Sequence, residues 1–136
     1  MEELPTVGFI GLGAMGNPMS GHLAQAGYRV LGFDIDDDNM AKAVSRGVEA
    51  ADSAAAIGTA CDVVLLCLPS MAIVEQTVET LLQQLPVGSV IVDHSTISPD
   101  LAGDLAERCK AQGIEFIDAP LSGAWQGAEA ATLAIM

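Results

Sequence analysis

The stretch TVGFIGLGAMGNP, Thr6–Pro18, decides the fold of this chain. Its first five residues predict a short buried strand, and the residues after the stretch keep apolar side chains at helical spacing as far as Ala26. Between strand and helix, Gly11, Gly13 and Gly16 are spaced G-x-G-x-x-G. A strand, a glycine turn and a helix in this order are typical of a site that binds the phosphates of a dinucleotide.

Each glycine of this turn has its own physical role. The first permits a tight turn, the second lets the backbone approach a pyrophosphate, and the third lets the helix pack closely on the strand. The N-terminus of the helix then directs its N–H groups at the phosphates. Because Pro18 has no N–H, it predicts that the helix begins late, near Ala14 or Met15.

A carboxylate follows at the position that a dinucleotide site requires. Asp34 ends the apolar run Tyr28–Phe33, about 20 residues beyond the turn, where an acid binds the ribose 2′-hydroxyl of NAD. It would repel a 2′-phosphate, and no Arg or Lys lies between Arg29 and Lys42 to hold one. The sequence therefore predicts NAD rather than NADP; the alternative is a tight structural turn with a surface acid. The predicted cofactor-binding residues here are Gly11, Leu12, Gly13, Ala14, Met15, Gly16 and Asp34.

Short apolar runs alternate with helical patterns along the rest of the chain. Several runs, such as Asp62–Leu68, are apolar at consecutive positions, which is typical of strands covered on both faces. The alternation predicts an α/β fold of the Rossmann type: a doubly wound, mostly parallel sheet with helices on both faces. The other predicted strands are Thr6–Ile10, Tyr28–Phe33, a short one at Val48–Ala50, Ser89–Asp93, Ile114–Asp118 and Thr132–Met136.

The predicted helices have recognisable ends. Ser98 is expected to cap a helix that ends at Gly113, and Asp52 to cap a short helix within Ala51–Gly58. The acidic run Asp36–Asp38 is interpreted as the solvated start of another helix. Apolar residues at helical spacing predict one more helix, with Val74, Val78, Leu81, Leu82 and Leu85 on its buried face.

Composition limits the possible partners. The chain has 136 residues, the size of one domain, and its five basic and eighteen acidic residues give a net charge of −13. This charge argues against nucleic acid and anionic membranes as partners, but not against a phosphate bound by backbone N–H groups.

No signal peptide or membrane span is recognised, so a cytoplasmic location is expected. Cys61, Cys67 and Cys109 are expected to be buried reduced thiols rather than disulfide or metal ligands, and no metal site is predicted.

Two later stretches make the interpretation more specific. They are DHSTISP at Asp93–Pro99 and DAPLSGAWQGAEAATLAIM at Asp118–Met136. Together with GFIGLGAMGNPM at Gly8–Met19 and CLPS at Cys67–Ser70, they resemble the β-hydroxyacid dehydrogenase family. That family includes 3-hydroxyisobutyrate dehydrogenase and is related to 6-phosphogluconate dehydrogenase. The resemblance covers nearly the whole chain, with the four motifs in the family's order.

The resemblance implies a cofactor domain followed by an all-helical domain, and hydride transfer between NAD and a small 3-hydroxy acid or semialdehyde. By position, Leu68 and Pro69 resemble the loop that borders the cofactor, and Thr96 the residue near the nicotinamide. These residues follow predicted strands at their carboxyl ends, where ligands bind in such sheets. The alternatives are that Thr96 only caps the sheet edge and that Ser122, in the later motif, is an ordinary turn residue. The implied substrate-binding turn is Ser122, Gly123 and Ala124, although many members have a second glycine at the last of these positions.

The resemblance also implies a general-base lysine that this chain does not match. Lys42 and Lys110 both fall within predicted peripheral helices. The chain stops inside an apolar run, so we expect residues 1–136 to be a truncated cofactor domain that is inactive alone, the helical domain being absent. The full-length protein is expected to be a homo-oligomer. Two alternatives stay open: the cofactor domain of an imine reductase-like enzyme, and a non-catalytic module with the dehydrogenase fold.

Overall fold

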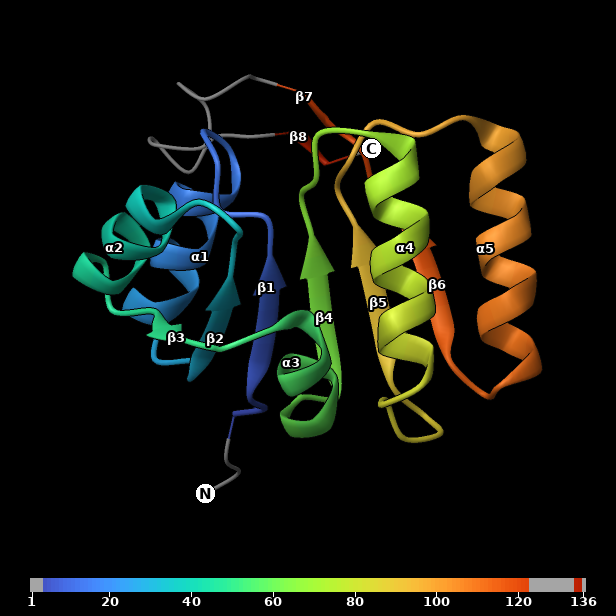
Figure 1. The fold of residues 1–136 in the computed structure, drawn as a ribbon, viewed down its shortest axis with the longest axis horizontal. Helices are drawn as coiled ribbons and strands as arrows, with labels where there is room; N and C mark the ends of the chain where they lie inside the picture. The colour runs from blue at the N-terminus through green and yellow to red at the C-terminus, as the bar shows by residue number, and fades with distance from the viewer. Residues whose placement is uncertain (1–3, 123–133, 136) are drawn as a thin grey trace.

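The protein folds around one sheet of six parallel strands. The structure, a computed structural model, describes residues 4–122 and 134–135. The strand order is β3-β2-β1-β4-β5-β6 (Figure 1), so the chain winds outward in both directions from β1. The strands are β1 (Val7–Ile10), β2 (Val30–Phe33), β3 (Glu49–Ala50), β4 (Val63–Leu66), β5 (Val90–Asp93) and β6 (Glu115–Asp118).

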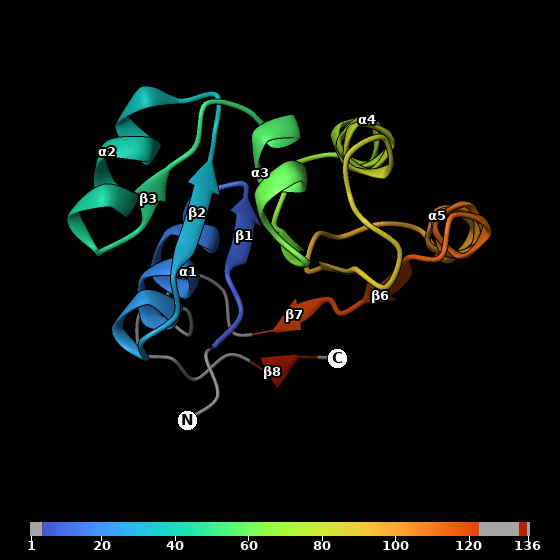
Figure 2. The ribbon, with the colours of Figure 1, turned by 90° about the horizontal axis from the view of Figure 1, so that it is seen from below.

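Helices cover both faces of the sheet (Figure 2). They are α1 (Gly16–Gln25), α2 (Asp37–Ser45), α3 (Ala54–Ala60), α4 (Met71–Leu82) and α5 (Pro99–Ala111). The first two lie on one face, and α3, α4 and α5 lie on the other. The predicted Rossmann architecture is therefore confirmed.

The core has one apolar cluster on each face of the sheet. Phe9, Leu12 and Val30 belong to the cluster beneath α1 and α2. Val64 and Leu81 belong to the larger cluster beneath α3, α4 and α5. Strand β1 is buried at all of its positions because it lies at the centre of the sheet with helices on both sides. This explains why the first apolar run does not alternate with polar residues.

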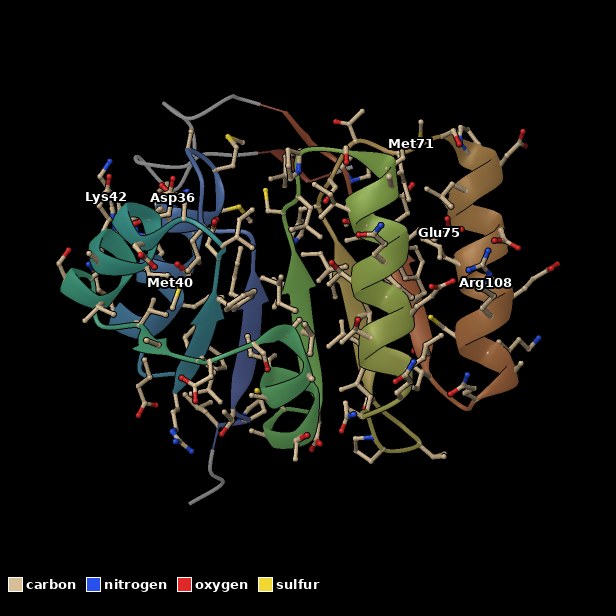
Figure 3. All side chains as sticks on the ribbon, in the orientation of Figure 1. Asp36, Met40, Lys42, Met71, Glu75 and Arg108 are labelled. Atoms are coloured by element: carbon tan, nitrogen blue, oxygen red, sulfur yellow. The ribbon has the colours of Figure 1, made fainter. Side chains whose placement is uncertain are left out.

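An ionic cluster joins α4 to α5 on the outer surface. The Arg108 guanidinium of α5 lies 2.9 Å from Glu75 Oε2 and 3.1 Å from Glu79 Oε1 of α4 (Figure 3). It also pairs with Asp104 of its own helix at 2.6 Å. These side chains are 37–58% exposed, so solvent screens their charges and we expect each ion pair to contribute little to stability.

One detail of the predicted elements is wrong. The short helix α3 is capped by Ser53, whose Oγ accepts a hydrogen bond from Ala56 N at 3.0 Å, and not by Asp52. A cap must accept from a backbone N–H two or three residues ahead, and this helix begins one residue later than Asp52 requires.

The last apolar run forms strand β8 (Ala134–Ile135), which pairs antiparallel with β7 (Leu121–Ser122) outside the main sheet.

The Ser98→Ala variant is expected to be less stable than the wild type by about 1 kcal/mol, with a Tm about 3–5 °C lower. Ser98 Oγ accepts a hydrogen bond from Leu101 N at 3.2 Å, so the variant leaves an N–H at the start of α5 without its side-chain acceptor. Thermal denaturation measures the loss. The control is Ser45→Ala on the exposed surface of α2, which should change stability by less than about 0.5 kcal/mol. Equal losses in the two variants would contradict the capping role.

None of the helices in the described residues is long and apolar enough to cross a membrane.

Candidate cofactor-binding site

The glycine turn is shaped by two close backbone contacts and one open face. Gly11 has φ +96°, and a Cβ there would collide with the Cys67 carbonyl oxygen. A Cβ at Gly16 would collide with the Gly11 carbonyl oxygen. A Cβ at Gly13, in contrast, would meet no atom of the described residues within 4 Å. The first and third glycines are therefore required by the fold, whereas the second leaves space in front of the turn.

Helix α1 begins late, as Pro18 predicts. Its first residue is Gly16, and Met15 at the N-cap makes no side-chain capping bond. Pro18 is the third helical residue, where a missing N–H leaves no intrahelical bond unmade. Within the described part of the chain, the N–H groups of Ala14 and Met15 have no acceptor. These donors and the positive end of the helix dipole are suited to bind an anion.

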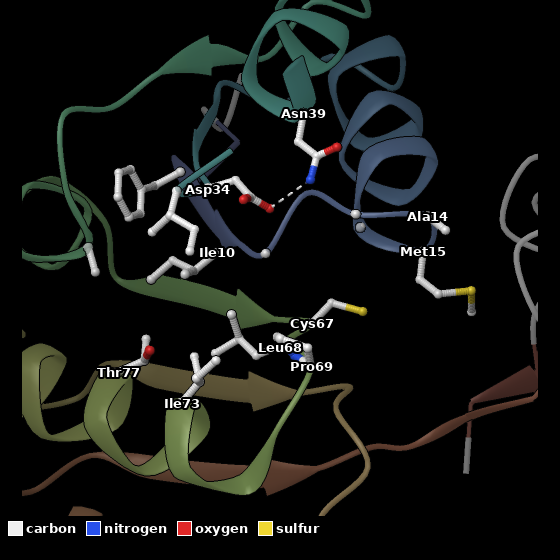
Figure 4. A pocket seen from close by; sticks show the side chains of 16 residues that line it. Ile10, Ala14, Met15, Asp34, Asn39, Cys67, Leu68, Pro69, Ile73 and Thr77 are labelled. Carbon is white, nitrogen blue, oxygen red and sulfur yellow. Dashed lines mark hydrogen bonds between the residues drawn. The ribbon is translucent and has the colours of Figure 1, made fainter. Parts of the chain in front are cut away.

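Asp34 joins the end of β2 to the glycine turn. Its Oδ2 accepts a hydrogen bond from Leu12 N at 2.8 Å, and its Oδ1 accepts one from Asp36 N at 2.8 Å. Asn39 Nδ2 lies 3.4 Å from Oδ2 (Figure 4). The carboxylate is only half-buried, so lone pairs remain accessible from the cavity.

The turn, Asp34 and the loop after β4 line one cavity of about 510 Å³ (Figure 4). This volume is within the range of about 300–1,000 Å³ of ligand pockets. The cavity lies at the carboxyl ends of β1, β2 and β4, the point where the strand order reverses and ligands bind in such sheets. Of the residues that the sequence singled out, the structure brings together here Gly11, Gly13, Ala14, Met15, Gly16, Asp34, Leu68 and Pro69.

Two of the predicted residues are placed differently. Leu12 does not line this cavity, because its side chain is buried in the core beneath α1. Thr96 is exposed and does not line this cavity. Its neighbour Ser95 is buried, and Ser95 Oγ accepts a hydrogen bond from Leu68 N at 2.7 Å. The loops after β4 and β5 are thus joined directly beside the position of Thr96.

The loop after β5 is also joined to the segment after β6. His94 Nδ1 lies 2.8 Å from the Ala119 carbonyl oxygen, and Ala119 N donates to the Asp93 carbonyl oxygen at 2.8 Å. This pair of bonds holds the segment after β6 against the end of β5. Ser122 lies in β7, and Gly123 and Ala124 lie outside the described residues.

Asp93 is a fully buried carboxyl group at the end of β5. Burial raises its pKa above the ordinary value of 3.8, an effect that hydrogen bonds from Ser95 partly offset. Oδ1 accepts from Ser95 N at 2.9 Å, whereas Oδ2 has no hydrogen-bond partner among the described residues. The buried group therefore favours its neutral form more than an exposed Asp does.

The stability of the Asp93→Asn variant relative to the wild type is expected to increase with pH. Because the folded-state pKa is raised, Asp93 stabilises the wild type below the ordinary carboxyl pKa of 3.8, and this contribution is lost as the pH rises through the raised value. The variant lacks this titration. Urea denaturation of both proteins from about pH 4 to 8 measures the difference. A difference in unfolding free energy that does not vary with pH would contradict the expectation.

Cys67 lines the cavity, whereas Cys61, Cys109 and the two lysines do not. Cys61 and Cys109 are buried and Cys67 is half-buried, and burial raises the pKa of each thiol to about 11. Lys42 lies on α2 (Figure 3) and Lys110 on α5. Both are exposed, and neither lines the cavity. Within the described residues, no three potential ligand side chains gather closely enough to hold a metal ion.

Comparison with known proteins gives the family of this chain. Residues 6–136 match the family described as the NAD binding domain of 6-phosphogluconate dehydrogenase. The chain belongs to this family. The NAD-binding domain is 40% identical over 139 residues to 2-(hydroxymethyl)glutarate dehydrogenase of Eubacterium barkeri, a match that covers 100% of this chain and 46% of that protein.

Solved structures of related dehydrogenases and reductases share the fold of this chain. The 3-hydroxyisobutyrate dehydrogenase of Mycobacterium tuberculosis, solved with L-serine, matches with a TM-score of 0.95 and 36% identity over 98% of this chain and 46% of that one. An imine reductase from Pseudomonas sp. matches with a TM-score of 0.82 and 26% identity over 92% of this chain and 44% of that one. The predicted resemblance to β-hydroxyacid dehydrogenases is therefore confirmed, and this NAD-binding domain spans just under half the length of the relatives it matches.

The sequence alone missed several residues of the site. The cavity of the NAD-binding domain is also lined by Ile35 and Asn39, which follow β2, and by Thr77 of α4. Buried Asn17 also stabilises the turn, because its Nδ2 donates a hydrogen bond to the Leu12 carbonyl oxygen. The only signals in the sequence were the closeness of Asn39 to Asp34 and of Asn17 to Gly16, and neither spacing specifies a contact.

Proposed function

We propose that this chain binds NAD at the glycine turn and forms the cofactor domain of a dehydrogenase that acts on a small 3-hydroxy acid or its semialdehyde. One observation carries the cofactor part: a single cavity combines the open face of Gly13, the N-terminus of α1 and the Asp34 carboxylate. A pyrophosphate needs the first two and a ribose diol needs the third. The residues present therefore fit a dinucleotide.

Each part of the cavity has a proposed role. The N–H groups of Gly13, Ala14 and Met15 bind the pyrophosphate, and Asp34 accepts hydrogen bonds from the ribose hydroxyls. Leu68 and Pro69 exclude water from one side of the cofactor. Thr96 lies outside the cavity, in the loop after β5, and is proposed to approach the nicotinamide end of the cofactor. When bound, NAD supplies a hydride acceptor at its nicotinamide ring.

A preference for NAD over NADP is part of the proposal. Asp34 brings a carboxylate to the cavity, and three further acids, Asp36, Asp37 and Asp38, follow it closely at the start of α2. A 2′-phosphate placed at this carboxylate would meet like charge, whereas a 2′-hydroxyl can donate to it.

Substrate binding is proposed for Ser122, Gly123 and Ala124, on the strength of the family motif. The proton acceptor is proposed to belong to a second domain, which is supported by the exposed positions of Lys42 and Lys110 away from the cavity. Residues 1–136 are proposed as the dinucleotide-binding domain of that enzyme, with no reaction of their own. Assembly of the whole enzyme as a homo-oligomer and a cytoplasmic location belong to the same proposal; three free thiols support a reducing compartment.

The second candidate is an imine reductase-like enzyme, which is favoured by the match to the Pseudomonas imine reductase. The higher identity of the hydroxyacid dehydrogenases favours the first candidate.

Fluorescence titration with NADH and NADPH tests the cofactor proposal. We expect NADH to bind at least about tenfold more tightly than NADPH, a difference of about 1.4 kcal/mol. Equal or tighter binding of NADPH would overturn the role of Asp34, and no binding of either would overturn the cofactor site. Oxidation of 3-hydroxyisobutyrate by this chain alone would overturn the assignment of the proton acceptor to a second domain.

A further inference from the structure

Asn17 lies behind the glycine turn, where its side chain bridges two backbone segments. It is the second residue of α1 and is only 5% exposed. Its Nδ2 donates to the Leu12 carbonyl oxygen at 3.0 Å and to the Asn39 carbonyl oxygen at 2.9 Å. One carboxamide therefore connects the turn after β1 with the first turn of α2.

The two acceptors explain why this residue is an asparagine. Two carbonyl oxygens need two N–H donors on one short side chain, and the asparagine amide nitrogen supplies both. An aspartate of the same shape has no donor, and a serine has one. Asn17 Oδ1 is buried with no hydrogen-bond partner in the described part of the chain. Because this oxygen is unpaired, the hydrogen bonds that the Asn17 side chain makes here are the two that its nitrogen donates.

The bond to Leu12 determines the direction of a phosphate donor. In a trans peptide, the C=O and the following N–H lie in one plane and point in opposite directions. The Leu12 carbonyl points towards buried Asn17, so the N–H of Gly13 in the same peptide points away from Asn17. Gly13 lines the cavity, and its N–H has no acceptor among the described residues.

The peptide before Leu12 is held from the other side. Leu12 N donates to Asp34 Oδ2 at 2.8 Å. The peptide planes on both sides of the Leu12 Cα are therefore fixed, one by Asp34 and one by Asn17. Together they set the orientation of the Gly13 N–H relative to the Asp34 carboxylate.

We propose that Asn17 is a positioning residue that orients the peptide between Leu12 and Gly13, so that the Gly13 N–H binds the phosphate of the cofactor. This inference rests on the proposed NAD-binding function. It predicts that Asn17 contributes to the binding of ligands that carry the pyrophosphate and not to the binding of the nucleoside alone.

The test compares ADP-ribose with adenosine on the wild type, Asn17→Asp and Ser20→Ala, with NMR titration for the weak ligand. In Asn17→Asp a carboxylate of the same shape faces two carbonyl oxygens, so we expect ADP-ribose affinity to fall at least about tenfold. Adenosine affinity should change less than about twofold. Ser20→Ala is the control because Ser20 is buried in the same helix and donates to the Asn17 backbone carbonyl at 2.9 Å, away from the carboxamide. It should lower Tm without changing the ratio of the two affinities.

The outcomes separate the two proposals. Failure of the wild type to bind ADP-ribose or NADH overturns the proposed function. Normal binding by the wild type with an unchanged affinity ratio in Asn17→Asp overturns the role of Asn17. If Asn17→Asp does not fold, NMR spectra of the wild type test the inference instead. ADP-ribose, but not adenosine, should shift the Gly13 amide proton downfield. Both side-chain amide protons of Asn17 should exchange slowly with solvent. A Gly13 amide that does not respond to ADP-ribose would overturn the inference.

Discussion

The Gly13→Ala variant is expected to fold normally and to bind NADH about 10- to 100-fold more weakly than the wild type, a loss of about 1.4–2.8 kcal/mol. Among the described residues, no atom lies within 4 Å of a Cβ placed at Gly13, and the φ of Gly13 is not positive, so we expect the fold to accept the methyl group. The methyl would, however, occupy the open face of the turn, where the proposed pyrophosphate approaches the backbone.

Gly11→Ala supplies the contrast for this prediction. Its φ of +96° is strained for alanine, and its Cβ would collide with the Cys67 carbonyl oxygen in the loop after β4. We expect a loss of about 2–5 kcal/mol in unfolding free energy and a Tm lower by about 10 °C or more. Thermal denaturation and NADH fluorescence, measured on both variants, separate the two glycines. A Gly13→Ala protein that binds NADH as well as the wild type would show that the ligand does not approach this face.

The Asp34→Asn variant is expected to lose about 10- to 100-fold in NADH affinity and to discriminate less against NADPH. The amide keeps the shape of the carboxylate but replaces one acceptor by a donor, although Asp34 receives hydrogen bonds from both Leu12 N and Asp36 N. One of these bonds must be lost, and the ribose loses a charged acceptor. Removal of the negative charge also removes the repulsion of a 2′-phosphate, so the affinity ratio of NADPH to NADH should rise at least about tenfold.

Asp38→Asn is the matched control for Asp34→Asn. Asp38 is an exposed acid in the first turn of α2 and does not line the cavity, so its substitution makes the same change in net charge nearby. It should shift the affinity ratio by less than about twofold, because exposed charges are screened by solvent and salt. A similar shift in both variants would indicate that the general acidity of the surface, and not the carboxylate at the turn, selects the cofactor.

Local sequence patterns predict most of this fold. The apolar runs predict the four central strands β2, β1, β4 and β5, because parallel strands covered on both faces need apolar side chains on both sides. The edge strands β3 and β6 are largely exposed. Ser98 predicts the start of α5, and Pro18 predicts the late start of α1, because caps and proline act within one helical turn. Asp52 fails as a cap because two neighbouring side chains could both cap α3, and only the position of the helix decides that Ser53 does.

Partners that are distant in the chain could not be predicted in this way. The last apolar run indicates a strand, yet only the tertiary structure decides that β8 pairs with β7 and not with the six-stranded sheet. An apolar run specifies the burial of its side chains, whereas the hydrogen-bond partner of its backbone depends on where the chain returns.

The sequence by itself determined the site's chemistry: three glycines with their spacing, an acid at the end of the second long strand, and the motifs that identify the family. Only the tertiary structure decided how these groups act together, since it joined Leu12 to Asp34, Asn17 to Asn39, and Leu68 to Ser95. The reason is physical. Residue type and local spacing fix which groups are available and which backbone conformations are allowed. Hydrogen bonds between segments 22 or 27 residues apart form only when strands and helices are packed, and they set the direction of each donor in the cavity.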